Sequence, residues 1–198
     1  TTVPAKYNAA EQGQLSSVRN QGGWGTCWSF SALAAAESAY KQLNGTEKNL
    51  SESHLVNFFY NDDITGPDGG LNGDAITAVG AAPVQRGGNS YFTTWGMARW
   101  TGIADEATDS SLEYPSNTYY TDELSIDSEF AYTDAMHLEN AYWISISDKE
   151  NVKKAVMEYG AVGVSYYYDG LFDSDCYKEY VDEDYSGPAV YYNSAYRT

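Results

Sequence analysis

Cys27 is the side chain of this 198-residue sequence best suited to nucleophilic chemistry. It opens an alanine-rich stretch, so its sulfur is expected in the first turn of a helix, where unpaired N–H groups and the helix dipole favour a thiolate. Gln21 lies upstream across a glycine-rich loop, and its side-chain amide could stabilise an oxyanion together with the Cys27 N–H. These residues predict attack on a carbonyl carbon, although a cysteine at a helix start, taken alone, is more often structural.

Three helices are predicted around this cysteine. The stretch 27–43 has no internal Gly or Pro and is followed by Asn-Gly, a helix stop. A second helix is predicted from Ser51 and a third over 90–100, because apolar residues recur there at helical spacing. The glycine-rich stretch 61–88 predicts a long surface loop. Cys27 therefore belongs to a helical region.

The pattern changes in the last third of the chain, after a polar, acidic stretch over 101–134 that predicts irregular structure. Helices early and strands late indicate an α+β chain of two lobes, residues 1–130 and 131–198. The elements predicted for the second lobe are a strand over 141–146, a helix over 149–159 between an Asp148 cap and a Gly160 stop, and strands over 161–168 and 189–192.

Composition excludes several classes of partner. The formal net charge of −17 would repel duplex nucleic acid and anionic membranes, and no run of 18 apolar residues could insert into a bilayer. Cys27 and Cys176 show no zinc-site spacing, so neither a metal nor a cofactor is expected. Acidic loops at 61–63 and 173–184 could bind calcium, but a solvated acidic surface is the favoured interpretation. The composition is typical of exported proteins.

The string QGGWGTCWSFSA at 21–32 resembles the nucleophile region of papain-like cysteine peptidases. Later motifs follow in that family's order, among them a Gly87-Gly88 pair like the one that presents backbone to substrate; Gly69-Gly70 competes for this role. The other motifs are LSESHLV at 50–56, Gly102-Ile103, Tyr114-Pro115, YGAVGV at 159–164 and GPAVYY at 187–192.

The resemblance implies a two-lobed papain-like fold, with a helical lobe followed by an incomplete β lobe. It implies a cysteine endopeptidase in which Cys27 and Gln21 are catalytic, and Gly25, Trp28 and the Gly87-Gly88 pair bind substrate. Peptides or proteins would be the substrates, and a propeptide or a C-terminal companion fragment would be the partner of a monomeric chain. The resemblance is to the cell-surface branch of the family found in anaerobic bacteria, which implies a secreted or cell-surface location.

The sequence departs from the family at two places. The family's disulfide positions hold Trp24 and Phe58, which predicts an aromatic pair in place of the bridge. The catalytic histidine is missing, because His54 belongs to the second helix and His137 precedes the expected position. The chain is therefore interpreted as the N-terminal portion of a longer enzyme, inactive alone. The alternatives are a catalytically silent peptide-binding module and an acidic, calcium-dependent surface domain.

Overall fold

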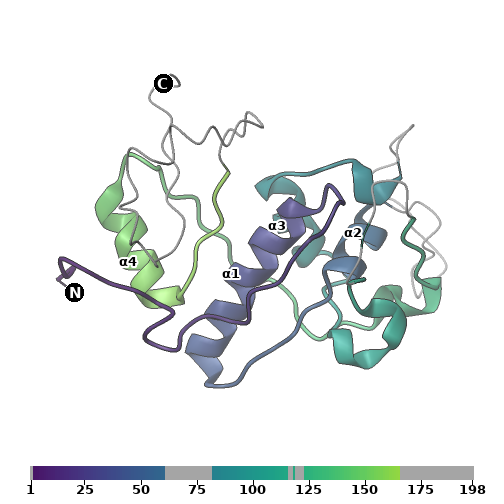
Figure 1. Ribbon diagram of the computed structural model, residues 1–198, viewed down its shortest axis with the longest axis horizontal. Coiled ribbons are helices and arrows are strands. Elements are labelled where there is room, and N and C mark those ends of the chain that lie inside the picture. The colour runs from purple at the N-terminus through teal and green to yellow at the C-terminus, as the bar shows by residue number, and fades with distance from the viewer. Residues whose placement is uncertain (1, 61–81, 116–117, 119–122, 166–198) are drawn as a thin grey trace, which may run out of the picture. The chain divides into compact units, whose positions relative to one another are not determined.

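The computed structural model describes residues 2–60, 82–115, 118 and 123–165. Residues 1–164 form one compact unit, called the first unit here. The predicted lobe boundary near residue 130 lies inside the first unit and stays a prediction. The α-helices among its described residues are α1 (Cys27–Asn44), α2 (Glu52–Tyr60), α3 (Ser90–Ala98) and α4 (Lys149–Tyr159), shown in Figure 1.

Helix α1 confirms the predicted helix and its stop. It ends at Gly45, whose φ of 69° is left-handed and whose N–H donates to the Lys41 carbonyl at 2.9 Å. Glycine adopts this conformation at low cost, and Lys41 in the last turn complements the negative end of the helix dipole. Local sequence therefore sets where α1 ends.

Helices α2 and α3 also form where predicted. The Ser51 hydroxyl accepts from the His54 N–H at 2.8 Å at the start of α2, all of whose residues are buried. The Asn89 side chain accepts from the N–H groups of Tyr91 and Phe92 and so caps α3. Helix α3 ends at Ala98, slightly before the predicted end.

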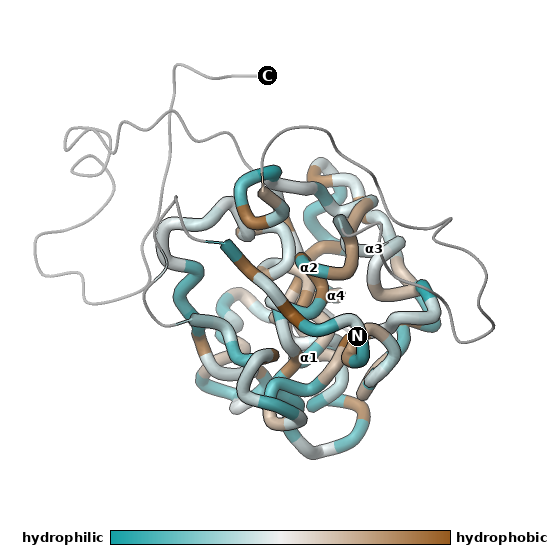
Figure 2. The backbone as a smooth tube through the Cα atoms, turned by 90° about the vertical axis from the view of Figure 1, so that its right-hand side faces the viewer, coloured by the Kyte–Doolittle hydropathy of each residue, from teal (hydrophilic) through white to brown (hydrophobic). Residues whose placement is uncertain are grey.

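The main hydrophobic core lies between α1, α2 and α3. It contains Trp24, Trp28, Leu33, Leu50, Leu55, Val56, Phe59, Tyr60, Val84, Met97 and Ile103. A second, smaller cluster packs Phe58 against Ala104, Leu112, Ile126 and Ala131. Figure 2 shows the hydropathy of these segments along the backbone. Helix α1, which begins at Cys27, is therefore held by packing against α2 and α3.

The described residues of the predicted irregular stretch 101–134 include three short 3-10 helices, η2 (Glu106–Thr108), η3 (Ser110–Leu112) and η4 (Ser128–Tyr132). Each follows an aspartate whose side chain accepts a backbone N–H: Asp105, Asp109 and Asp127. Isolated β-bridges join Leu50 to Asp105 and Ile103 to Met136. The polar stretch is therefore held to the helices by caps and single bridges.

The predicted strand over 141–146 is wrong, because these residues form no ladder within the described part of the chain. Alternation reports which side chains would share a face, but a strand also needs a neighbouring strand to accept its hydrogen bonds. Residues 161–165 likewise carry no ladder, and the predicted strand over 189–192 lies outside the described residues. Helix α4, which lies between residues 146 and 161, forms as predicted, with an Asp148 cap and a Gly160 stop.

Candidate active site

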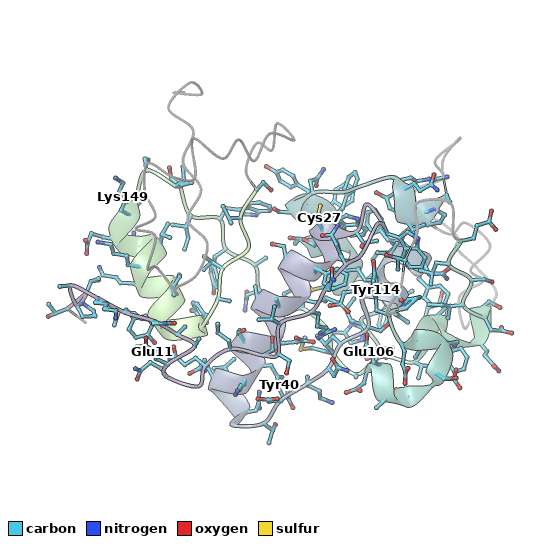
Figure 3. All side chains as sticks on the ribbon, viewed as in Figure 1. Glu11, Cys27, Tyr40, Glu106, Tyr114 and Lys149 are labelled. Atoms are coloured by element: carbon cyan, nitrogen blue, oxygen red, sulfur yellow. The ribbon has the colours of Figure 1, made fainter. Side chains whose placement is uncertain are left out.

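Cys27 is the first residue of α1 and its side chain is exposed (Figure 3). Thr26 precedes the helix but makes no side-chain capping bond. Its fully buried hydroxyl instead lies 2.7 Å from the hydroxyl of Tyr114. The helix start is thus anchored to a distant segment, while the thiol faces outward.

Tyr114 and Thr118 fix the loop that leads to Cys27. Both hydroxyls donate to the Gln21 carbonyl, at 2.7 Å and 3.0 Å, and Thr118 Oγ1 also accepts the Gly23 N–H at 2.7 Å. Because the Tyr114 hydroxyl has one hydrogen, it accepts its second bond from Thr26. Burial raises the pKa of Tyr114 to about 12, so it remains a donor at physiological pH.

The Gln21 side chain lies within this loop. Its Nε2 donates to the Trp24 carbonyl at 2.8 Å, and since an amide nitrogen carries two hydrogens, this bond uses one of them. The bond orients the amide on the loop that ends at Cys27. Its predicted role toward an oxyanion stays a prediction.

Gly25 joins the approach loop to the segment that carries Gly87. The Gly25 N–H donates to the Val84 carbonyl at 2.7 Å, and a Cβ on Gly25 would lie 3.5 Å from the Gly87 nitrogen. Gly87 has a φ of 66°, and its carbonyl accepts the Tyr60 hydroxyl at 2.6 Å. Segments distant in sequence therefore meet beside the start of α1.

Trp28 lies beneath Gly88. The indole is 5% exposed and packs edge-to-face on Phe59 and Tyr60, with ring centroids 5.4 and 5.9 Å away. A Cβ on Gly88 would come within 2.4 Å of the indole, so this approach requires glycine. Trp28 therefore supports the Gly88 backbone from below. The competing pair Gly69-Gly70 lies outside the described residues.

The two histidines of the sequence are engaged elsewhere. The fully buried His54 has Nε2 3.1 Å from the Phe130 carbonyl, and burial lowers its pKa to about 4. His137 Nε2 lies 2.8 Å from the Asp134 carboxylate. Within the described residues no hydrogen bond joins either histidine to Cys27, and that neither is the catalytic base stays a prediction.

The predicted Trp24–Phe58 pair is wrong. Trp24 packs edge-to-face on Tyr114 at 5.5 Å, whereas Phe58 packs on His54 in the smaller core cluster. The two aromatic rings belong to different clusters, so they are not a direct substitute for a disulfide. Sequence spacing cannot show which cluster an aromatic residue joins.

A buried charge cluster was not predicted. Arg19 pairs with Glu37, with Glu52 at 2.6 Å and with Glu106 at 3.8 Å. Burial raises the pKa of Glu52 to about 7, although Arg19 acts in the opposite direction. Burial by itself lowers the pKa of Arg19, but the neighbouring carboxylates raise it by more, so the pKa is raised overall. The sequence signal that could have revealed this cluster is the presence of charged residues at core positions of α1 and α2.

The described residues hold no group of three or more His, Cys, Asp or Glu side chains that could bind a metal ion. Both acidic loops considered for calcium, and Cys176, lie outside the described residues. No helix in the described part of the chain is long and apolar enough to cross a membrane.

An exposed cysteine at the start of a core-packed helix lies beside an exposed glycine backbone, which is the arrangement that the sequence predicts for a thiol nucleophile. The chain belongs to the papain family of cysteine proteases, whose family pattern matches residues 3–190. Cysteine peptidase activity is thus supported at the level of the family. The α+β papain-like fold class is confirmed, with a helical lobe and an incomplete β lobe.

Plant cysteine proteases and a clostridial structure are similar to this chain. Cysteine protease Amb a 11.0101 of Ambrosia artemisiifolia is 27% identical over 186 residues, 89% of this chain and 40% of that protein. Cysteine proteinase 2 of Zea mays is 40% identical over 77 residues, 39% of this chain and 21% of that protein. The chain thus spans less than half of these relatives. A clostridial cysteine protease after propeptide cleavage shares the fold, with TM-score 0.57 and 22% identity over 78% of this chain and 34% of that one.

Proposed function

We propose that this chain is the nucleophile-bearing part of a cysteine endopeptidase that cleaves peptide bonds through a Cys27 thiolate and an acyl-enzyme. The observation that carries the proposal is the exposed Cys27 thiol at the first residue of α1, beside the Gly87-Gly88 segment. Gly25 and Trp28 hold that segment through the contacts described above. Membership of the papain family supports the same chemistry.

The reaction begins when the Cys27 sulfur attacks the scissile carbonyl carbon, forming a C–S bond and an oxyanion. The Cys27 N–H and the Gln21 side-chain amide donate to this oxyanion. The C–N bond then breaks, and the amine leaves with a proton while a thioester remains on Cys27. Water hydrolyses the thioester, which releases the acid and restores the thiol. Because His54 and His137 are engaged elsewhere, the imidazole that carries the proton comes from outside this chain, and the chain alone is inactive.

An extended peptide is the proposed substrate. Its backbone would pair with Gly87 and Gly88, since an exposed backbone segment can add a peptide as a strand. Gly88 is exposed, and Trp28 below it prevents the segment from sinking into the core. The net charge of −17 favours neutral or basic peptides over acidic ones.

The proposal also covers the location of the enzyme, its oligomeric state and its partner. A secreted or cell-surface bacterial peptidase, monomeric and made with a propeptide or a companion fragment, would fit the composition. The clostridial protease structure has a similar fold, which agrees with this part of the proposal.

Labelling with a peptidyl epoxide tests the nucleophile. In the intact protein, which supplies the imidazole, Cys27 is expected to be alkylated at least about tenfold faster than Cys176 at the same probe concentration and time, as measured by peptide mapping. Gln21→Ala should slow the labelling of Cys27, and Cys27→Ser should leave only the reaction of Cys176. Labelling confined to Cys176 would contradict the proposal.

A catalytically silent peptide-binding module is the second candidate, favoured by the engagement of both histidines away from Cys27. The two functions differ in one measurement on the intact protein. A peptidase cleaves a peptide under reducing conditions and loses this activity in Cys27→Ser, whereas a silent module binds the peptide equally with and without the thiol.

A further inference from the structure

Two tyrosine hydroxyls bond to backbone carbonyls on the two segments beside the start of α1. The Tyr114 hydroxyl donates to the Gln21 carbonyl at 2.7 Å, and the Tyr60 hydroxyl donates to the Gly87 carbonyl at 2.6 Å. Gln21 belongs to the loop that leads to Cys27, whereas Gly87 belongs to the segment proposed to bind substrate. Each of these segments is therefore bonded by a tyrosine of its own.

The Thr26 hydroxyl fixes the direction of the Tyr114 hydrogen bond. A threonine before a helix usually caps it, because its hydroxyl accepts a backbone N–H of the first turn. Thr26 makes no such bond, and its hydroxyl lies 2.7 Å from the Tyr114 hydroxyl instead. Since the single hydrogen of the Tyr114 hydroxyl goes to the Gln21 carbonyl, Thr26 donates to Tyr114. The Thr26 hydroxyl thus supports the bond to Gln21 rather than the end of the helix.

Aromatic packing holds both tyrosine rings. Tyr114 packs edge-to-face on Trp24 and Phe30, with ring centroids 5.5 and 4.7 Å away. Tyr60 is 6% exposed and packs edge-to-face on Trp28, with ring centroids 5.9 Å apart. A ring held in this way gives its hydroxyl a fixed place, and the carbonyl that accepts from this hydroxyl is fixed with it.

We propose that Tyr114 and Tyr60 are positioning residues of the peptidase with separate effects, an inference that rests on the proposed function. Tyr114 sets the Gln21 amide against the oxyanion, and Tyr60 sets the Gly87-Gly88 backbone against the bound peptide. The oxyanion forms only as the carbonyl carbon is attacked, so a displaced Gln21 lowers kcat. A displaced Gly87 weakens the binding of substrate and transition state alike, so it raises KM.

The test measures kcat and KM of the intact protein, which supplies the imidazole. The substrate is an internally quenched peptide of neutral and basic residues that the wild-type protein cleaves. Tyr114→Phe should lower kcat about tenfold and leave KM within about twofold, because a small displacement of a catalytic donor is costly. Tyr60→Phe should raise KM about fivefold and leave kcat within about twofold. Tyr142→Phe, at a 74% exposed position, is the matched control and should change neither constant.

A double substitution shows whether Tyr114 acts through Gln21. In the Gln21→Ala background, Tyr114→Phe should lower kcat by less than about twofold, because the amide that Tyr114 positions is already gone. A tenfold loss in this background would show a general effect on the fold and would overturn the assignment. Thr118→Val removes another bond to the Gln21 carbonyl, at 3.0 Å, and should lower kcat about threefold, which keeps the test open if Tyr114→Phe does not fold.

The outcomes separate this inference from the proposed function. If the intact protein cleaves no peptide in a Cys27-dependent way, the proposed function fails and the inference fails with it. If Cys27-dependent cleavage is present but both tyrosine variants change the same constant, or neither changes any, the inference alone is refuted.

Discussion

Replacement of Arg19 by methionine is expected to destabilise the chain by about 3–5 kcal/mol at pH 7.5, because it leaves buried carboxylates without their cation. Arg19 contacts Glu52 at 2.6 Å, and its guanidinium also donates to the Leu50 carbonyl at 2.9 Å. Urea unfolding followed by tryptophan fluorescence measures the difference in unfolding free energy. The matched control is Lys153→Met, whose ion pair with Glu150 spans 3.7 Å between side chains 56% and 65% exposed. That exposed pair should contribute less than about 1 kcal/mol.

The cost of Arg19→Met should also depend on pH. The pKa of Glu52 is about 7 when Arg19 is present, and removing Arg19 raises it further. Near pH 5 this carboxyl is protonated in both proteins, so the loss should shrink toward about half of its value at pH 7.5. If the variant does not fold, adding Glu37→Gln and Glu52→Gln should restore folding, because the uncompensated charges are then gone. A loss below about 1 kcal/mol, or an equal loss at both pH values, would refute the reasoning.

Three further predictions concern the site and the core. Gly88→Ala should cost about 1–3 kcal/mol and slow epoxide labelling of Cys27, because its Cβ would lie 2.4 Å from the Trp28 indole; unchanged labelling and unfolding would show that the segment relaxes. Tyr114→Phe should cost about 1–2 kcal/mol in urea unfolding, since it removes the hydroxyl bonds to Gln21 and Thr26, while Tyr142→Phe at a 74% exposed position should change little. The pKa of His54 is lowered to about 4, so the unfolded state gains a proton first and the protein loses stability as pH falls from about 6.5 toward 4. The pKa of Glu52 is raised to about 7, so the unfolded state loses a proton first and the protein loses stability as pH rises from about 4.5 toward 7. The stability of His54→Gln should therefore fall with rising pH across this range and that of Glu52→Gln should rise; parallel curves would contradict both assignments.

Much of the helical architecture could be predicted from the sequence because its signals are local. The Asn-Gly stop after α1, the Asn89 cap of α3 and the Asp148 cap of α4 each act within a few residues of the helix end. The nucleophile motif around Cys27 is equally local, so the candidate nucleophile and the loop before it were found without tertiary information.

The absence of a strand over 141–146 could not be predicted, because strand formation depends on residues far away in the sequence. Its alternation of residues is real, but a ladder depends on a partner that the described residues do not supply. The aromatic pair Trp24–Phe58 failed in a similar way, because proximity between segments far apart in sequence depends on how the helices pack.

The sequence by itself determined where the helices lie, the position of Cys27 at a helix start and the family of the chain. Only the tertiary structure brought Gly25 against the Gly87 segment and placed Gly88 on Trp28. It also decided that Arg19 gathers carboxylates from α1, α2 and η2. The physical reason is that caps and propensities act over a few residues of backbone, whereas these contacts arise when apolar faces are buried together and bring distant polar groups within bonding distance.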